Sequence, residues 1–133
     1  ITTLSFPDIK DAIVVFGKGY GVGTLCNIPW LEKMQIYYWG DMDMDGYAIL
    51  SQLRGYYPQT RSFLMDEKTY KLFEKTGVSY PRKEKIRILP NLTREEEKVY
   101  EILSNRSLKS GFRIEQERIP FSYLKKFLAT TSL

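Results

Sequence analysis

The sequence has 133 residues, of which 43% are hydrophobic, and this is enough for one globular domain or most of one. Its single cysteine, Cys26, excludes a disulfide framework and suits a reducing cytoplasm. No stretch approaches the roughly 18 apolar residues of a membrane span, and no signal-peptide pattern opens the chain. We therefore expect a cytoplasmic protein that does not enter a membrane.

The net charge of +4 is modest but unevenly distributed. Residues 1–65 carry five basic and six acidic side chains, whereas residues 66–90 carry seven and four, and residues 105–133 carry six and two. The excess of basic side chains therefore lies in the second half of the chain. This distribution suits contact with a polyanion, although many unrelated soluble domains share it.

The first predicted element is a buried strand over residues 12–16, Ala-Ile-Val-Val-Phe. It ends in a glycine-dense turn that begins with Gly17, Lys18 and Gly19. Glycines let a backbone approach a phosphate closely, and Lys18 would add a point charge. The turn matches neither the phosphate-loop nor the dinucleotide-binding pattern. A phosphate contact and a plain strand-to-helix turn are therefore equally good interpretations.

The most informative stretch is residues 36–46, Ile-Tyr-Tyr-Trp-Gly-Asp-Met-Asp-Met-Asp-Gly. Its first half predicts a buried strand of a parallel sheet, and in such sheets the working groups lie where the strands end. Asp41, Asp43 and Asp45 repel one another at this point, so a positive group should lie between them. Because the chain has no histidine, an all-oxygen site favours a hard cation, Mg²⁺ (or Mn²⁺), over zinc.

Other interpretations of the three aspartates compete with a metal site. Their spacing copies the start of a calcium-binding EF-hand loop, but its twelfth position, which should be glutamate, is Gln52. A phosphatase-type nucleophile would need a threonine or valine two residues on. In the plainest interpretation, Asp45 N-caps a helix over residues 46–54 and the other two acids are solvated. For Asp45 alone, this capping role is the favoured prediction.

The rest of the chain continues an alternation of strand and helix, which predicts an α/β fold with a parallel sheet and right-handed crossovers. A short helix should end near Asn27, and Trp30 and Leu31 should pack under the sheet. A strand over 61–65, a helix over 67–75 capped by Asp66 and a basic loop over 79–92 should follow. The last two elements should be a helix that begins with a Thr93–Glu96 capping box and a terminal helix carrying Tyr123, Leu124, Phe127 and Leu128.

Five sequence blocks occur in one order and together resemble a known family. They are Phe16-Gly17-Lys18-Gly19-Tyr20-Gly21-Val22, Pro29-Trp30-Leu31, Tyr38-Trp39-Gly40-Asp41-Met42-Asp43-Met44-Asp45-Gly46-Tyr47-Ala48-Ile49-Leu50, Arg61-Ser62-Phe63-Leu64-Met65-Asp66 and Glu115-Gln116-Glu117-Arg118-Ile119. This arrangement resembles the C-terminal Toprim domain of the D subunit of the Wadjet anti-plasmid system. That domain is similar in turn to the Toprim domain of topoisomerase VI A subunits. Residues 1–133 would then be a single Toprim-like domain and the C-terminal fragment of a longer protein.

The resemblance implies a Toprim fold, a parallel sheet flanked by helices, with a magnesium site made by one glutamate and an Asp-x-Asp pair. The pair corresponds to Asp41 and Asp43, and Asp45 would be an additional ligand that the family does not imply. The family's glutamate precedes the segment that matches residues 1–4, so we expect both it and the first strand to be missing. The remaining two carboxylates should bind the metal weakly and support no cleavage by this chain alone.

The resemblance also implies a DNA endonuclease that uses water and works with an SMC-like motor complex against plasmid or foreign DNA. The expected partners are DNA, subunits of that complex and a second copy of the chain. Basic residues would contact phosphates without reading sequence; the candidates are Lys18, Arg82, Lys83, Arg113 and Arg118. A competing interpretation is a non-catalytic module that binds DNA and dimerises.

Glu115 and Glu117 form a second acidic pair in the resemblance. On a strand their side chains would point the same way, and on a helix they would diverge. Salt bridges to Arg113 or Arg118 are their favoured role, ahead of binding a second metal ion.

Overall fold

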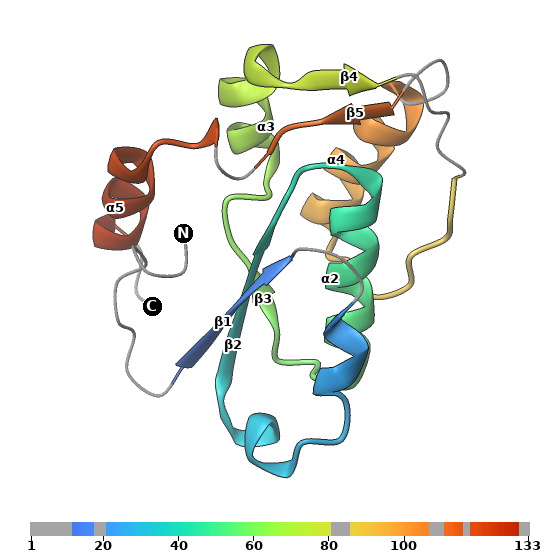
Figure 1. Ribbon diagram of the computed structural model, residues 1–133, viewed down its shortest axis with the longest axis vertical. Helices are drawn as coiled ribbons and strands as arrows, with labels where there is room; N and C mark the ends of the chain where they lie inside the picture. Colours follow the sequence, from blue (N-terminus) through green and yellow to red (C-terminus); the bar gives the residue numbers. More distant parts are fainter. Residues whose placement is uncertain (1–11, 18–20, 81–85, 107–110, 116–117, 131–133) are drawn as a thin grey trace.

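A parallel sheet forms the centre of the computed structural model, which describes residues 12–17, 21–80, 86–106, 111–115 and 118–130 (Figure 1). Within these residues the sheet has three strands in the order β1-β2-β3, with helices on its sides. The strands are β1 (Ala12–Gly17), β2 (Gln35–Gly40) and β3 (Arg61–Ser62). The predicted α/β class is confirmed, and the arrangement is consistent with a Toprim-like fold. The expectation of a missing first strand stays a prediction, and residues 1–11 lie outside the described part.

The middle strand, β2, is buried from Ile36 to Gly40, as its unbroken apolar sequence predicts. It pairs in parallel with β1 along its whole length, so that Gly17 at the end of β1 lies beside Gly40. The hydroxyl of Tyr38, which is fully buried, donates a hydrogen bond of 3.1 Å to the carbonyl oxygen of Gly46. This bond ties the middle of β2 to the helix that follows it.

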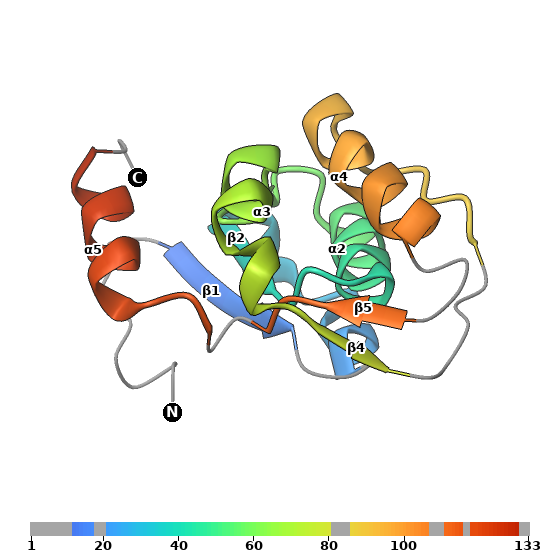
Figure 2. The ribbon, with the colours of Figure 1, turned by 90° about the horizontal axis from the view of Figure 1, so that it is seen from above.

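Helices lie on both sides of the sheet, as the view from above shows (Figure 2). None in the described part of the chain is long and apolar enough to cross a membrane. The α-helices are α2 (Met44–Tyr56), α3 (Glu67–Phe73), α4 (Arg94–Arg106) and α5 (Phe121–Thr130), and the 3-10 helices are η1 (Gly21–Leu25), η2 (Pro29–Lys33) and η3 (Glu74–Thr76).

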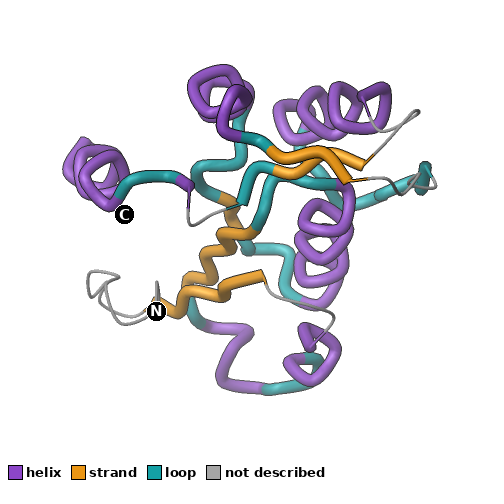
Figure 3. Tube along the Cα trace, turned by 45° about the horizontal axis from the view of Figure 1, so that its top comes forward, coloured by secondary structure: helices purple, strands orange, loops and turns teal. Residues whose placement is uncertain are grey.

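A second, two-stranded sheet lies across the end of the molecule where β2 stops (Figure 3). Its strands, β4 (Val78–Tyr80) and β5 (Gly111–Arg113), are antiparallel. The loop predicted over residues 79–92 is wrong at its beginning, because residues 79 and 80 belong to β4. Beyond β5, Ile114 pairs with Met42, and this contact attaches the small sheet to the end of β2.

Two predicted helix starts are confirmed. The side chain of Asp66 accepts a hydrogen bond of 3.0 Å from the N–H of Thr69, which caps α3. Thr93 and Glu96 form the predicted capping box, each side chain accepting from the other residue's N–H at 3.2 and 2.8 Å. The terminal helix is also present, with Leu124 buried in the core.

Three local predictions are confirmed only in part. The strand predicted over residues 61–65 is paired only at 61–62, because the chain turns at Leu64, whose φ is 55°. The helix expected to reach Asn27 is the short η1. Trp30 is 59% exposed although Leu31, its neighbour in η2, is 2% exposed, because successive residues of a 3-10 turn face different directions.

Candidate functional site

The two aspartates Asp41 and Asp43 lie where β2 ends and α2 begins. Asp43 is the N-cap of α2, and its Oδ1 accepts a hydrogen bond of 2.6 Å from the N–H of Gly46. Met42, between them, is 1% exposed and points into the core. Because successive side chains of an extended segment alternate, Asp41 and Asp43 share the opposite face. The structure therefore places both carboxylates together at the carboxyl end of the middle strand.

The assignment of the N-cap to Asp45 is wrong, since Asp43 holds that position and α2 begins at Met44. Asp45 lies in the first turn of α2, where a negative charge is favoured by the helix dipole. The early start of the helix also excludes an EF-hand loop, because Gln52 and most of the residues that would form the loop are helical.

Gly46 permits the close approach between the first turn of α2 and the end of β2. A Cβ atom at this position would lie 2.0 Å from the carbonyl oxygen of Asp41 and 3.1 Å from Oδ1 of Asp43. Any side chain here would push the helix away from the two aspartates. The glycine of the Asp-x-Asp-x-Asp-Gly stretch is thus needed for the geometry of the site.

A positive group lies beside the aspartates, as expected, and it is the guanidinium of Arg113. Its Nε donates to Oδ2 of Asp43 at 2.5 Å and lies 3.9 Å from Oδ2 of Asp41. The antiparallel bridge between Met42 and Ile114 brings Arg113 there. It places Arg113 opposite Asp43 in the register, and cross-strand neighbours of this kind carry their side chains on the same face. The contact joins residues 70 positions apart in the sequence.

The same bridge places Glu115 opposite Asp41 in the register. Glu115 is half-buried, and Glu117 lies outside the described residues. The expected salt bridges of this acidic pair stay a prediction. Arg113, one of their expected partners, contacts the two aspartates.

Burial controls the electrostatics of the site. It raises the pKa of Asp43 above its usual value; hydrogen bonds from the Gly46 N–H and Arg113 lower the pKa without outweighing this effect. Burial also raises the pKa of Tyr38, and the charges of Asp43 and Asp41 raise it further. The surroundings of Asp43 thus disfavour its negative charge, and a cation there relieves that cost.

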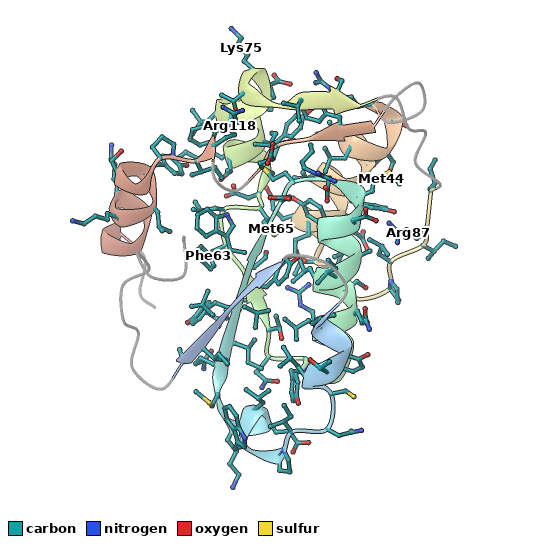
Figure 4. All side chains as sticks on the ribbon, viewed as in Figure 1. Met44, Phe63, Met65, Lys75, Arg87 and Arg118 are labelled. Atoms are coloured by element: carbon teal, nitrogen blue, oxygen red, sulfur yellow. The ribbon has the colours of Figure 1, made fainter. Side chains whose placement is uncertain are left out.

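Asp45 is held by a second arginine. Arg87 lies on the segment that follows residue 85, and its guanidinium donates a hydrogen bond of 2.7 Å to Oδ1 of Asp45 (Figure 4). The Tyr100 hydroxyl fixes this segment: it accepts from the Arg87 N–H at 3.3 Å and donates to the Arg87 carbonyl at 3.0 Å. The role of Asp45 as a metal ligand stays a prediction, and a metal there would compete with Arg87.

The other predicted phosphate-binding residues are only partly described. Arg118 is exposed on the segment between β5 and α5 (Figure 4). Gly17 ends β1 beside Gly40, which places the start of the glycine-rich turn at the same edge as Asp41. The remaining candidates, Lys18, Gly19, Arg82 and Lys83, lie outside the described residues.

The two aspartates suit a hard cation by their chemistry, because magnesium and manganese prefer carboxylate oxygens. In the observed arrangement, however, the described residues hold no group of three histidine, cysteine, aspartate or glutamate side chains that could bind a metal ion. Both oxygens of Asp43 also have donors, one from Gly46 and one from Arg113. A cation bound by Asp43 would therefore lie beside the Arg113 guanidinium and repel it.

The chain matches the family described as "Wadjet protein JetD, C-terminal" over residues 1–128. It belongs to the JetD C-terminal family. The Wadjet resemblance found in the sequence is thus confirmed, and JetD membership implies a role in plasmid defence as part of a multi-subunit system. A search of the curated proteins found no match.

The JetD match includes both the aspartates and the arginines that contact them. The pairing of Arg113 with Asp43 and of Arg87 with Asp45 was not predicted from the sequence. One signal was available, because Arg113-Ile114-Glu115 repeats the polar-apolar-polar alternation of Asp41-Met42-Asp43. Two such segments can pair with their apolar residues inward and their polar residues on one face.

A polar cavity of about 690 Å³ lies away from the aspartates, near the first residues of β2 and β3. It borders a buried ion pair in which Arg54 donates to both oxygens of Glu96, at 2.5 and 3.0 Å. Burial opposes ionisation, but hydrogen bonds from Arg54, Ser62 and the Thr93 N–H outweigh it and lower the pKa of Glu96. These groups satisfy one another and join α2 to α4, so we interpret them as structural.

Proposed function

We propose that this chain is the Toprim-like domain of a metal-dependent DNA endonuclease that acts on plasmid or foreign DNA in Wadjet defence. The observation that supports this proposal is the placement of Asp41 and Asp43 on one face at the carboxyl end of β2. This is the edge at which open α/β sheets carry their functional groups. Membership of the JetD family supplies the defence context.

Bound Mg²⁺ or Mn²⁺ would polarise a phosphoryl oxygen and stabilise the leaving 3′-oxygen. The protein's own contribution is to orient the ligands. Asp43 is held by the N–H of Gly46, and Asp41 is held by its place between β2 and the Met42 bridge. Arg113 and Arg118 are available to contact phosphates on either side of the cleaved bond, and such contacts carry no sequence information.

The proposal includes partners that remain to be tested. Beyond DNA, these are SMC-like subunits of the Wadjet system and a second copy of this chain. A relationship to the Toprim domain of topoisomerase VI A subunits also belongs to the proposal, as does a glutamate upstream of residue 1 that would complete the metal site.

A second candidate function is a DNA-binding and dimerisation module without catalytic activity. The observation that favours it is the pairing of the acids with arginines of the chain itself, Asp43 with Arg113 and Asp45 with Arg87. In that case the carboxylates would stabilise the fold, and the exposed basic residues would hold DNA.

Nicking of supercoiled plasmid separates the two functions. Asp43→Asn removes one negative charge but retains an N-cap acceptor, and Asp66→Asn makes the same change at the cap of α3. In a version of the chain extended upstream through the expected glutamate, we expect Asp43→Asn and Asp41→Asn to abolish Mg²⁺-dependent nicking, while Asp66→Asn retains it. Nicking that survives both site substitutions would contradict the nuclease. Loss of nicking in Asp66→Asn as well would attribute the effect to folding.

The assay should compare this chain with a version extended upstream through the expected glutamate. We expect nicking only by the extended version, because two carboxylates hold magnesium loosely. A manganese-soaked crystal should show the ion about 2.0–2.6 Å from the oxygens of Asp41 and Asp43. Equal nicking by the two versions would show that the upstream glutamate is not needed.

A further inference from the structure

We infer that Arg113 is an exchangeable counter-ion, which occupies the aspartate pair without metal and transfers to a DNA phosphate when a divalent cation binds. This inference rests on the proposed function, because it assigns a positioning role at the same metal site. It predicts that metal binding and DNA binding favour each other. It also predicts that Arg113 contributes to the weak metal binding of the chain without DNA.

The contacts of Asp43 identify Arg113 as the donor that a bound cation can displace. Oδ1 of Asp43 accepts from the N–H of Gly46, and Oδ2 accepts from Nε of Arg113 at 2.5 Å. The Gly46 N–H belongs to the backbone of α2, so it cannot turn away without unwinding the first turn of the helix. The guanidinium is at the end of a flexible side chain and can be displaced.

The exposure of the side chains shows that Arg113 can leave the aspartate pair toward solvent. The side chain of Asp43 is 4% exposed, whereas that of Arg113 is 36% exposed and that of Asp41 is 22% exposed. Asp43 is thus enclosed, while Arg113 covers it from the solvent side. The Met42–Ile114 bridge holds the backbone next to Arg113, so the side chain can swing outward while its Cα stays at the site.

The charges explain why a phosphate would receive the guanidinium. A divalent cation beside Asp41 and Asp43 repels Arg113 and so favours its transfer to another anionic partner. A DNA phosphate is such a partner, because the guanidinium binds phosphate oxygens in bidentate geometry. The phosphate also attracts the cation, so the two ligands stabilise each other. By linkage, DNA must raise the metal affinity by the same factor as metal raises the DNA affinity.

Manganese binding, measured from the electron paramagnetic resonance signal of free Mn²⁺, tests this inference without requiring cleavage. The samples are the chain, its Arg113→Gln and Arg113→Lys variants, Asp43→Asn, and Arg94→Gln as a control at an exposed arginine of α4. Each is titrated with and without a short duplex that has non-cleavable phosphorothioate linkages.

Without DNA, we expect Arg113→Gln to bind Mn²⁺ at least about fivefold more tightly than the unchanged chain, in the range of typical coupling between sites. DNA should raise the Mn²⁺ affinity of the unchanged chain by a similar factor and that of Arg113→Gln much less. Arg113→Lys should lie between them, because lysine keeps the charge without the guanidinium geometry. Arg94→Gln should behave as the unchanged chain does.

The outcomes separate this inference from the proposed function. If Asp43→Asn loses Mn²⁺ binding while Arg113→Gln binds no more tightly than the unchanged chain, the metal site stands and the role of Arg113 is overturned. If neither the unchanged chain nor Arg113→Gln binds Mn²⁺ through Asp43, the role of Arg113 is overturned, and the same titration of the version extended upstream decides the metal site of the proposed function. Should Arg113→Gln not fold, the unchanged chain still decides, because a Mn²⁺ affinity that DNA does not raise overturns the exchange.

Discussion

Met42 and Ile114 form an antiparallel bridge that joins the end of β2 to the end of β5. The N–H of Met42 donates to the carbonyl oxygen of Ile114 at 2.9 Å, and the N–H of Ile114 donates back at 3.2 Å. Both side chains are buried, at 1% and 0% exposed, so the residues beside them face the other way. This single pair brings Arg113 onto the face that carries Asp41 and Asp43. The two candidate functions assign different partners to these aspartates, a metal ion in the nuclease and arginines in the binding module.

The space at Gly46 leads to the first prediction. Gly46→Ala should destabilise the chain by about 1–3 kcal/mol, as overpacking typically does, because its Cβ would lie 2.0 Å from the carbonyl oxygen of Asp41. It should also weaken Mn²⁺ binding by displacing Asp41. Gly21→Ala is the control, since no atom lies within 4 Å of a Cβ at that position. Urea unfolding measures the stability of the two variants, and equal stability would contradict the packing argument.

The two roles of Asp43 can be separated by substitution. Asp43→Ala should lose about 1 kcal/mol from the missing N-cap, whereas Asp43→Asn keeps a capping oxygen. The raised pKa of Asp43 means that its charged form is disfavoured in the folded state at neutral pH. Asp43→Asn should therefore unfold at a urea concentration no lower than that of the unchanged chain at pH 7. A large loss of stability in Asp43→Asn would show that the pairing with Arg113 outweighs the cost of burial.

The buried pair of Arg54 and Glu96 determines part of the pH dependence. The pKa of Glu96 is lowered in the folded state, so the ionised pair adds stability above the ordinary value of 4.5, and this is lost as pH falls through the folded pKa. Glu96→Gln should lower the free energy of unfolding at pH 7 by about 3–5 kcal/mol, because it leaves Arg54 unpaired. Its stability should also fall less steeply below pH 4.5. Unfolding curves between pH 3 and 7 measure both effects, and parallel curves would contradict the assignment.

DNA affinity should depend on salt and not on sequence. If three to five basic groups contact phosphates, the logarithm of the binding constant should fall with the logarithm of salt concentration with a slope of roughly −3 to −4. Arg118→Gln should reduce this slope by about one and weaken binding to all sequences alike. Fluorescence anisotropy of labelled duplexes provides the measurement. A flat salt dependence would exclude a phosphate-driven interaction.

The sequence alone determined the features that depend on neighbouring residues. The apolar run from Ile36 to Trp39 identified a buried parallel strand, and the caps at Asp66 and at Thr93 with Glu96 identified where α3 and α4 begin. These patterns are readable because strand alternation and helix capping involve residues at most a few positions apart. The five blocks of the resemblance likewise identified the family.

Only the tertiary structure decided what surrounds the aspartates. Local pattern placed the N-cap at Asp45 and could not show that α2 starts two residues earlier against the end of β2, where Gly46 leaves room. The partner of Asp43 is Arg113, which is 70 residues away in the sequence. Their contact follows from the register of one bridge between distant segments, and shifting that register by a single residue would turn Arg113 to the opposite face. Register of this kind is set by the packing of Met42 and Ile114 in the core, which no local pattern records.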